Sequence, residues 1–160
     1  MIKYVDTLVG FREIPDEITL CINISNCPNN CSGCHSSWLL KDEGTPLTYV
    51  ELRSLINKNK GITCVCFMGG DKEPWEIQRL AKLVKEDFGI KTAWYSGKDE
   101  IWKGIDLLYF DYVKIGSYKK ELGPLNSPTT NQVLYKIFHT EVSIVMRDIT
   151  NKFWKTWKSK

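Results

Sequence analysis

The chain has 160 residues with a formal net charge of +3, and 42% of its residues are hydrophobic. This length predicts one domain with a substantial core, and it excludes a complete eight-unit (β/α) barrel, which needs about 250 residues. The near balance of charge gives no indication of nucleic-acid binding, and no signal peptide or membrane span is expected. Six partly clustered cysteines suit a reducing compartment, so we expect a cytoplasmic protein.

The first 46 residues are expected to form two strands and the loops that follow them. A short strand and turn are expected within Tyr4–Pro15, and the alternation in Ile18–Ile24 predicts the first main strand. The charged stretch Trp38–Pro46 is expected to be a loop. The segment Cys27–Cys34 therefore leaves the carboxyl end of the first main strand, which is where active sites gather in α/β proteins.

Two amphipathic helices are expected. Thr48, with Glu51 three residues later, is typical of a capping box and begins a helix that runs to about Lys58. Pro74 suits the first position of a second helix, and Gly89 is its expected stop. The apolar residues expected on their inward faces are Val50, Leu52, Leu55 and Ile56, then Ile77, Leu80, Ala81, Leu83 and Val84.

Further strands alternate with these helices. The expected strands are Ile62–Met68, Ile90–Tyr95, Leu107–Ile115, Gln132–Phe138 and Val142–Met146, and a short helical turn is expected at Asp99–Lys103. Strand–helix units in this order imply parallel pairing with right-handed crossovers. We therefore predict an α/β fold, a partial open (β/α) barrel that forms a single domain over residues 1–160.

The chain ends in a basic tail from about residue 151. Its aromatic residues indicate a short amphipathic helix docked on the domain by Phe153, Trp154 and Trp157. A solvated face is the ordinary interpretation of its lysines, and a contact with an acidic partner or nucleic acid is the alternative. These lysines are Lys152, Lys155, Lys158 and Lys160.

Three cysteines within eight residues form the strongest motif. Cys27, Cys31 and Cys34 have the spacing C-x3-C-x2-C. Thiolates favour iron–sulfur clusters, zinc or Cu(I), and three of them can hold three corners of a [4Fe–4S] cluster, which leaves one iron open to another ligand. Structural zinc is the alternative, although zinc sites usually pair cysteines as C-x2-4-C with a distant second pair. Cys21 is a rival ligand, but a buried cysteine on a strand is ordinary core packing.

This spacing resembles the cluster motif of the radical S-adenosylmethionine (AdoMet), or radical SAM, enzymes. The resemblance implies that the open iron binds the amino and carboxylate groups of AdoMet. Gly69-Gly70-Asp71, which follows the second main strand, resembles the family's GGE motif, whose backbone carbonyls and carboxylate hold the AdoMet ammonium. Here Asp stands in place of Glu, and without the family context the segment would be only a strand-to-helix turn.

The same resemblance suggests roles for other residues near the cluster motif. Lys114 is expected to meet the AdoMet carboxylate, with a solvent-facing lysine on an edge strand as the alternative. The family usually has an aromatic residue before the last cluster cysteine, whereas this chain has Gly33, so backbone groups from Gly33 to His35 would have to reach the adenine. His35 could also support the cluster from outside its ligand shell, or it could be a plain loop residue. Cys64 and Cys66 share one face of a strand, and core packing is expected for both.

Much of the chain also resembles the activating proteins of the anaerobic (class III) ribonucleotide reductases. The resemblance rests on the small size, on Leu8–Arg12, on the cysteine loop and on the stretch from Tyr112 to Gln132. It implies an oxidoreductase that uses a [4Fe–4S] cluster and AdoMet to generate a glycyl radical on the reductase, with an electron donor such as flavodoxin. The alternatives are an activase of another glycyl-radical enzyme, a small-molecule radical enzyme, and a non-catalytic metal-binding module.

Overall fold

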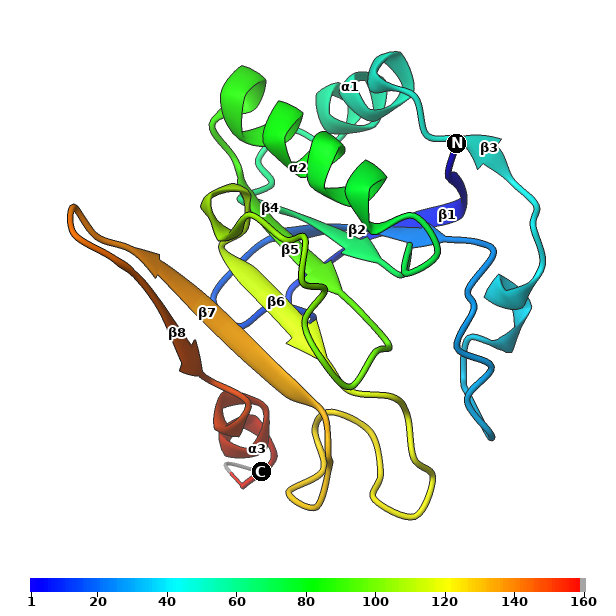
Figure 1. Ribbon diagram of the computed structural model, residues 1–160, viewed down its shortest axis with the longest axis vertical. Helices are drawn as coiled ribbons and strands as arrows, with labels where there is room; N and C mark the ends of the chain where they lie inside the picture. Colours follow the sequence, from blue (N-terminus) through cyan, green and yellow to red (C-terminus); the bar gives the residue numbers. More distant parts are fainter. Residues whose placement is uncertain (159–160) are drawn as a thin grey trace.

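The computed structural model describes the backbone of residues 1–158 and the side chains of residues 1–154 (Figure 1). Within them, eight strands form one mixed sheet in the order β3-β1-β2-β4-β5-β6-β7-β8, and three α-helices accompany it. The sheet is curved but not closed, since β3 and β8 do not pair. The α/β prediction is confirmed at this coarse level.

Most strands overlap the predicted segments, and β3 and the start of β6 are the main differences. The strands are β1 Lys3–Gly10, β2 Thr19–Ile24, β3 Thr45–Pro46, β4 Cys64–Met68, β5 Lys91–Tyr95, β6 Tyr112–Ile115, β7 Val133–His139 and β8 Ile144–Asp148. The helices are α1 Tyr49–Lys58, α2 Pro74–Phe88 and α3 Asn151–Lys158, with 3-10 helices η1 Ser37–Leu40 and η2 Leu107–Tyr109.

Four adjacent strands, β2, β4, β5 and β6, are parallel, as the order of elements predicts. The flanking pairs β1–β2, β1–β3, β6–β7 and β7–β8 are antiparallel. Only the first two parallel connections contain an α-helix, and the connection from β5 to β6 is a loop with η2. The carboxyl ends of the four parallel strands meet at one edge of the sheet, and this edge carries the candidate site.

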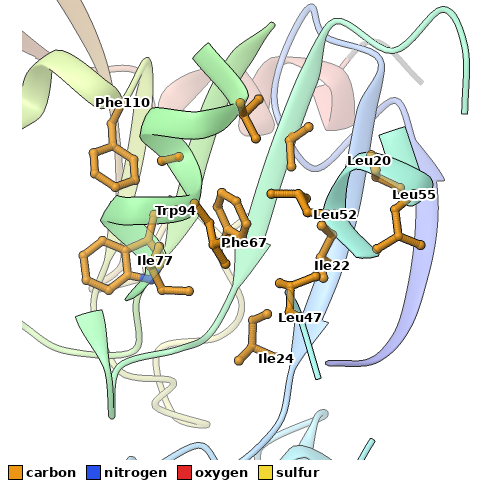
Figure 2. Close-up of a cluster of buried hydrophobic side chains, with 14 of the residues drawn as sticks. Leu20, Ile22, Ile24, Leu47, Leu52, Leu55, Phe67, Ile77, Trp94 and Phe110 are labelled. Atoms are coloured by element: carbon orange, nitrogen blue, oxygen red, sulfur yellow. The ribbon is translucent and has the colours of Figure 1, made fainter. Parts of the chain in front are cut away.

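The two faces of the sheet bury different cores. Helices α1 and α2 cover one face (Figure 1), and the larger core lies beneath them around Phe67 and Trp94 (Figure 2). Successive residues of β4 point to opposite faces, so Cys64 and Cys66 enter a smaller core on the other face. Phe153 of α3 packs against this second core. The predicted packing role of the two cysteines is confirmed, because both are fully buried.

Helix α1 begins as predicted but buries fewer residues than expected. The Thr48 side chain accepts a hydrogen bond from the Glu51 backbone N–H, which caps the helix. The Glu51 carboxylate does not complete the box; it accepts a hydrogen bond from the Tyr4 hydroxyl. Burial of Val50 was a wrong prediction, because this side chain is 74% exposed on the far side of the helix from Leu52.

Three loop predictions need correction. The stretch 38–46 was predicted as a plain loop, but it contains most of η1 and all of β3, which pairs with Lys3 and Tyr4. No helical turn forms at 99–103, where Asp99 instead accepts hydrogen bonds from Ser117. The predicted strand from Leu107 begins only at Tyr112, because the Asp106 side chain caps the 3-10 turn of η2 through the Leu108 N–H.

The basic tail forms α3, in agreement with the expected amphipathic helix. Its Lys152 side chain pairs with Asp16 at 3.0 Å, which ties the helix to the turn after β1. The side chains of Trp157, Lys155, Lys158 and Lys160 lie outside the described residues. No helix in the described part of the chain has the length and apolar content needed to cross a bilayer.

Candidate active site

The cysteine loop leaves the carboxyl end of β2, as predicted. Cys27, Cys31 and Cys34 are free thiols and are partly exposed. The base of the loop is fixed by a hydrogen bond from the Cys27 N–H to the Leu39 carbonyl, at 3.0 Å. The Cys34 N–H closes the tip on the Cys31 carbonyl, at 3.2 Å. The loop thus presents all three thiols close to solvent at the edge of the sheet.

The three sulfurs do not form a ready-made metal site. Among the side chains that the structure describes, no group of three or more histidine, cysteine or acidic residues is arranged to hold a metal ion. Binding a cluster would therefore require the three sulfurs to converge. The donor chemistry nevertheless fits an iron–sulfur cluster, because all three donors are cysteine thiols. Two of the sulfurs also accept hydrogen bonds, Cys27 Sγ from Asn29 Nδ2 at 3.6 Å and Cys34 Sγ from the Ser36 N–H at 3.4 Å.

The Gly69-Gly70 turn follows β4 directly, and both glycines have positive φ angles, of 108° and 89°. A Cβ on Gly70 would lie 2.4 Å from Ile77 Cδ1, so α2 packs against the turn too closely for a side chain. The Gly69 carbonyl accepts a hydrogen bond from Trp94 Nε1 at 2.8 Å. The positive φ angles, together with the packing of Ile77 against Gly70, thus account for both glycines, while each carbonyl oxygen keeps a further lone pair for a ligand.

Asp71 is the centre of a hydrogen-bond network that joins three loops. One carboxylate oxygen accepts a hydrogen bond from Ser96 Oγ at 2.5 Å. The other accepts bonds from the Gly97 N–H at 2.8 Å and from Asn29 Nδ2 at 2.7 Å. These donors come from the loops after β5 and β2, while Asp71 follows β4. The network therefore fixes the relative positions of the cysteine loop, the glycine turn and the end of β5.

Lys114 lies on β6 in the interior of the sheet, with only 8% of its surface exposed. The edge-strand alternative is therefore wrong, because β6 pairs with both β5 and β7. Its ammonium group donates to the carbonyls of Ser96 and Gly116, at 3.2 and 2.9 Å. Burial lowers the pKa of Lys114 from 10.5 to about 8, against the opposing influence of Asp71 and the nearby cysteines. A buried cation with no direct carboxylate contact is thus held beside the Asp71 network.

The lowered pKa of Lys114 makes stability depend on pH in a specific window. Between pH 8 and 10.5 the unfolded chain binds this proton more tightly than the folded protein, so the free energy of unfolding should rise with pH in that range. Lys114→Met removes this titration. Urea unfolding of both proteins at pH 7 and pH 9.5 should show a smaller increase in the variant. An identical increase in the two proteins would mean that Lys114 titrates at its ordinary pKa.

Gly33 and His35 are exposed and face a different loop from the Asp71 network. The His35 ring packs against Tyr118, with ring centroids 5.3 Å apart. A Cβ on Gly33, which has a φ angle of 71°, would lie 3.5 Å from the Lys120 side chain. The loop after β6 therefore closes over the tip of the cysteine loop, and the contacts of these two residues are with Tyr118 and Lys120.

The three remaining cysteines are not part of the candidate site. Cys21, Cys64 and Cys66 are buried, and burial raises the pKa of all three thiols, that of Cys21 to about 12. A neutral buried thiol is a poor nucleophile and a poor metal ligand. The interpretation of Cys21 as a small core residue and not a fourth ligand agrees with this environment.

The sequence did not predict the three donors of this network, Asn29, Ser96 and Gly97. Asn29 lies inside the cysteine motif, at a position that the spacing leaves unspecified, and Ser96 and Gly97 directly follow the predicted strand Ile90–Tyr95. Their contacts with Asp71 depend on three loops meeting at one edge of the sheet, and a local sequence pattern cannot predict such a meeting.

Comparison of this chain with protein-family models, with curated proteins and with solved structures finds no match.

Proposed function

We propose that this protein is a radical AdoMet enzyme that activates an anaerobic ribonucleotide reductase by generating a glycyl radical on it. The observation that carries the proposal is the Asp71 network. It links the C-x3-C-x2-C loop after β2 to the Gly-Gly-Asp turn after β4, with the buried cation of Lys114 nearby. A thiolate cluster loop, an acidic turn and a cation at one sheet edge suit a ligand that carries both an ammonium and a carboxylate.

Each group of this chain has a defined part in the proposed reaction. Cys27, Cys31 and Cys34 would hold a [4Fe–4S] cluster, which supplies the electron that cleaves AdoMet and so produces the radical that abstracts the glycine hydrogen. The second lone pairs of the glycine-turn carbonyls, together with Asp71, would receive the ammonium of AdoMet. The ammonium group of Lys114 would neutralise the carboxylate of AdoMet.

Two features favour a protein substrate over a small molecule. In the described part of the chain, three α-helices and two short 3-10 helices accompany the sheet, and few elements of that part enclose the site. The sheet is open, and a loop of a partner protein could complete the wall of the site. Together with the resemblance of the Tyr112–Gln132 segment, these features lead us to propose the glycyl-radical subunit of the reductase as partner, a flavodoxin-like donor and a cytoplasmic location.

Electron paramagnetic resonance on anaerobically reconstituted, dithionite-reduced protein tests the cofactor part of the proposal. We expect a [4Fe–4S]⁺ signal whose shape changes when AdoMet is added, because AdoMet would coordinate the open iron. A colourless zinc protein, or a cluster whose signal is indifferent to AdoMet, would overturn the proposed chemistry.

The partner needs a separate experiment. Reduced protein and AdoMet are incubated with the anaerobic reductase, and the glycyl radical is measured on the reductase. A matched incubation uses a different glycyl-radical enzyme. If the radical forms only on the second enzyme, the proposed radical AdoMet chemistry holds, but the reductase is not the partner.

A further inference from the structure

Asn29 contacts both halves of the candidate site. One side-chain nitrogen, Nδ2, lies 2.7 Å from Asp71 Oδ2 and 3.6 Å from Cys27 Sγ. An amide NH2 has two hydrogens, so it can donate to the carboxylate and to the sulfur at once. We propose that Asn29 is a positioning residue that sets the Cys27 sulfur and the Asp71 carboxylate in one arrangement and so couples the cluster to the AdoMet subsite. The inference rests on the proposed function.

Gly97 lies directly beside this pair of hydrogen bonds and leaves room for the Asn29 amide. A Cβ at Gly97 would lie 2.5 Å from Asn29 Nδ2 and 3.5 Å from Asp71 Oδ2. The backbone of Gly97 is not in the left-handed region, so its conformation does not require glycine. A Cβ at this position would instead displace the Asn29 side-chain amide from its present place. The Gly97 N–H also donates to the same Asp71 oxygen, at 2.8 Å.

The two hydrogen bonds of Asn29 have separate and measurable consequences. A donor to a ligand sulfur stabilises the reduced, more negative state of a cluster and so raises its midpoint potential. A donor to Asp71 keeps the carboxylate oriented toward the ammonium subsite. Asn29→Ala should therefore shift the midpoint potential to a more negative value. It should also raise the Kd of AdoMet about tenfold or more, the range expected for the loss of one hydrogen bond to a charged group.

Gly97→Ala and Ser96→Ala make the test specific. Gly97→Ala keeps Asn29 but displaces its amide, so it should reproduce both effects. Ser96→Ala removes the donor to the other Asp71 oxygen and touches no cysteine. It should raise the Kd of AdoMet and leave the potential unchanged. The potentials are measured by redox titration of the cluster signal, and the AdoMet affinities by anaerobic calorimetry, after iron and sulfide contents have been matched.

The outcomes separate the inference from the proposed function. If the wild-type protein binds no cluster, the proposed function fails. If the wild-type cluster responds to AdoMet while Asn29→Ala and Gly97→Ala leave potential and affinity unchanged, only the inference is overturned. A potential that moves equally in Ser96→Ala would also overturn it, because the effect would then be general loosening of the site. If Asn29→Ala does not assemble a cluster, the midpoint potential and the AdoMet Kd of Gly97→Ala decide whether the inference holds.

Discussion

The double variant Cys31→Ala, Cys34→Ala is expected to bind no [4Fe–4S] cluster and to form no glycyl radical on the reductase. Only Cys27 would remain of the three partly exposed thiols, and one thiolate cannot hold a cubane cluster. The loss of activation should be complete. The fold should persist, because both side chains lie in a loop at the sheet edge and contribute nothing to either core. Iron content and the glycyl radical signal are the measurements.

A matched variant removes two cysteines that have the opposite environment. Cys64→Ala, Cys66→Ala deletes two buried thiols of β4. It should keep the full iron content and lose stability by about 1 kcal/mol for each small cavity. Loss of iron from this variant would show that buried cysteines supply ligands, and full activation by the loop variant would contradict the assignment of the cluster loop.

The sequence allowed the prediction of elements whose signals are local. Thr48, Pro74 and Gly89 mark helix ends through their own backbone chemistry, and each lies where it was expected. The alternation of β2 and the continuous apolar segment of β4 are both local signals, and β4 is apolar throughout because both of its faces are covered, which is typical of parallel strands. The order of these elements then brings the cysteine loop and the Gly-Gly-Asp turn to the same edge.

Most of the wrong or missed predictions have non-local causes, and the start of β6 is the exception. Val50 has the helical spacing of a buried residue, but the helix leaves its side chain 74% exposed. Leu107 begins an apolar run, yet the Asp106 cap turns the chain into η2 first. Lys114 could not be distinguished from an edge lysine, because the pairing of β6 with β7 depends on a chain reversal twenty residues later. Asn29 and Gly97 are polar or small loop residues whose meeting depends on three connections at once.

The opposite end of the parallel strands carries a second polar network, centred on Glu17. This carboxylate is 5% exposed and accepts hydrogen bonds from Lys91 at 2.5 Å, Thr63 at 2.5 Å and the Tyr112 hydroxyl at 3.0 Å. Its partners lie at or just before the starts of β4, β5 and β6, while Glu17 itself precedes β2. In closed (β/α) barrels the amino-terminal edge of the strands serves stability and the carboxyl-terminal edge serves function. By analogy we expect the Glu17 network to stabilise this sheet, while Asp71 belongs to the proposed site at the other edge.

Glu17→Gln is expected to lower the free energy of unfolding by about 2 kcal/mol at pH 7, because it removes the charge from a buried carboxylate with three donors. Burial raises the pKa of Glu17, but the hydrogen bonds from Lys91, Thr63 and Tyr112 outweigh it and lower the pKa below the ordinary value of 4.5. The stabilisation is therefore fully present above pH 4.5 and is lost as pH falls through the folded-state pKa.

Urea unfolding of wild type and Glu17→Gln at pH 7, 5 and 3 measures this dependence. The difference between the two proteins should be large at pH 7 and 5 and should shrink at pH 3. Glu86→Gln is the control, because it removes a carboxylate that is exposed to solvent. The Glu86 side chain is 55% exposed, and its Oε1 lies 3.8 Å from Lys82 Nζ on the surface of α2. That variant should change stability by no more than about 0.5 kcal/mol. A Glu17→Gln protein as stable as wild type at pH 7 would mean that the amino-terminal network does not hold the strands together. If the stability difference between the two proteins stays unchanged at pH 3, the Glu17 side chain stabilises the strands through its packing and not through its charge.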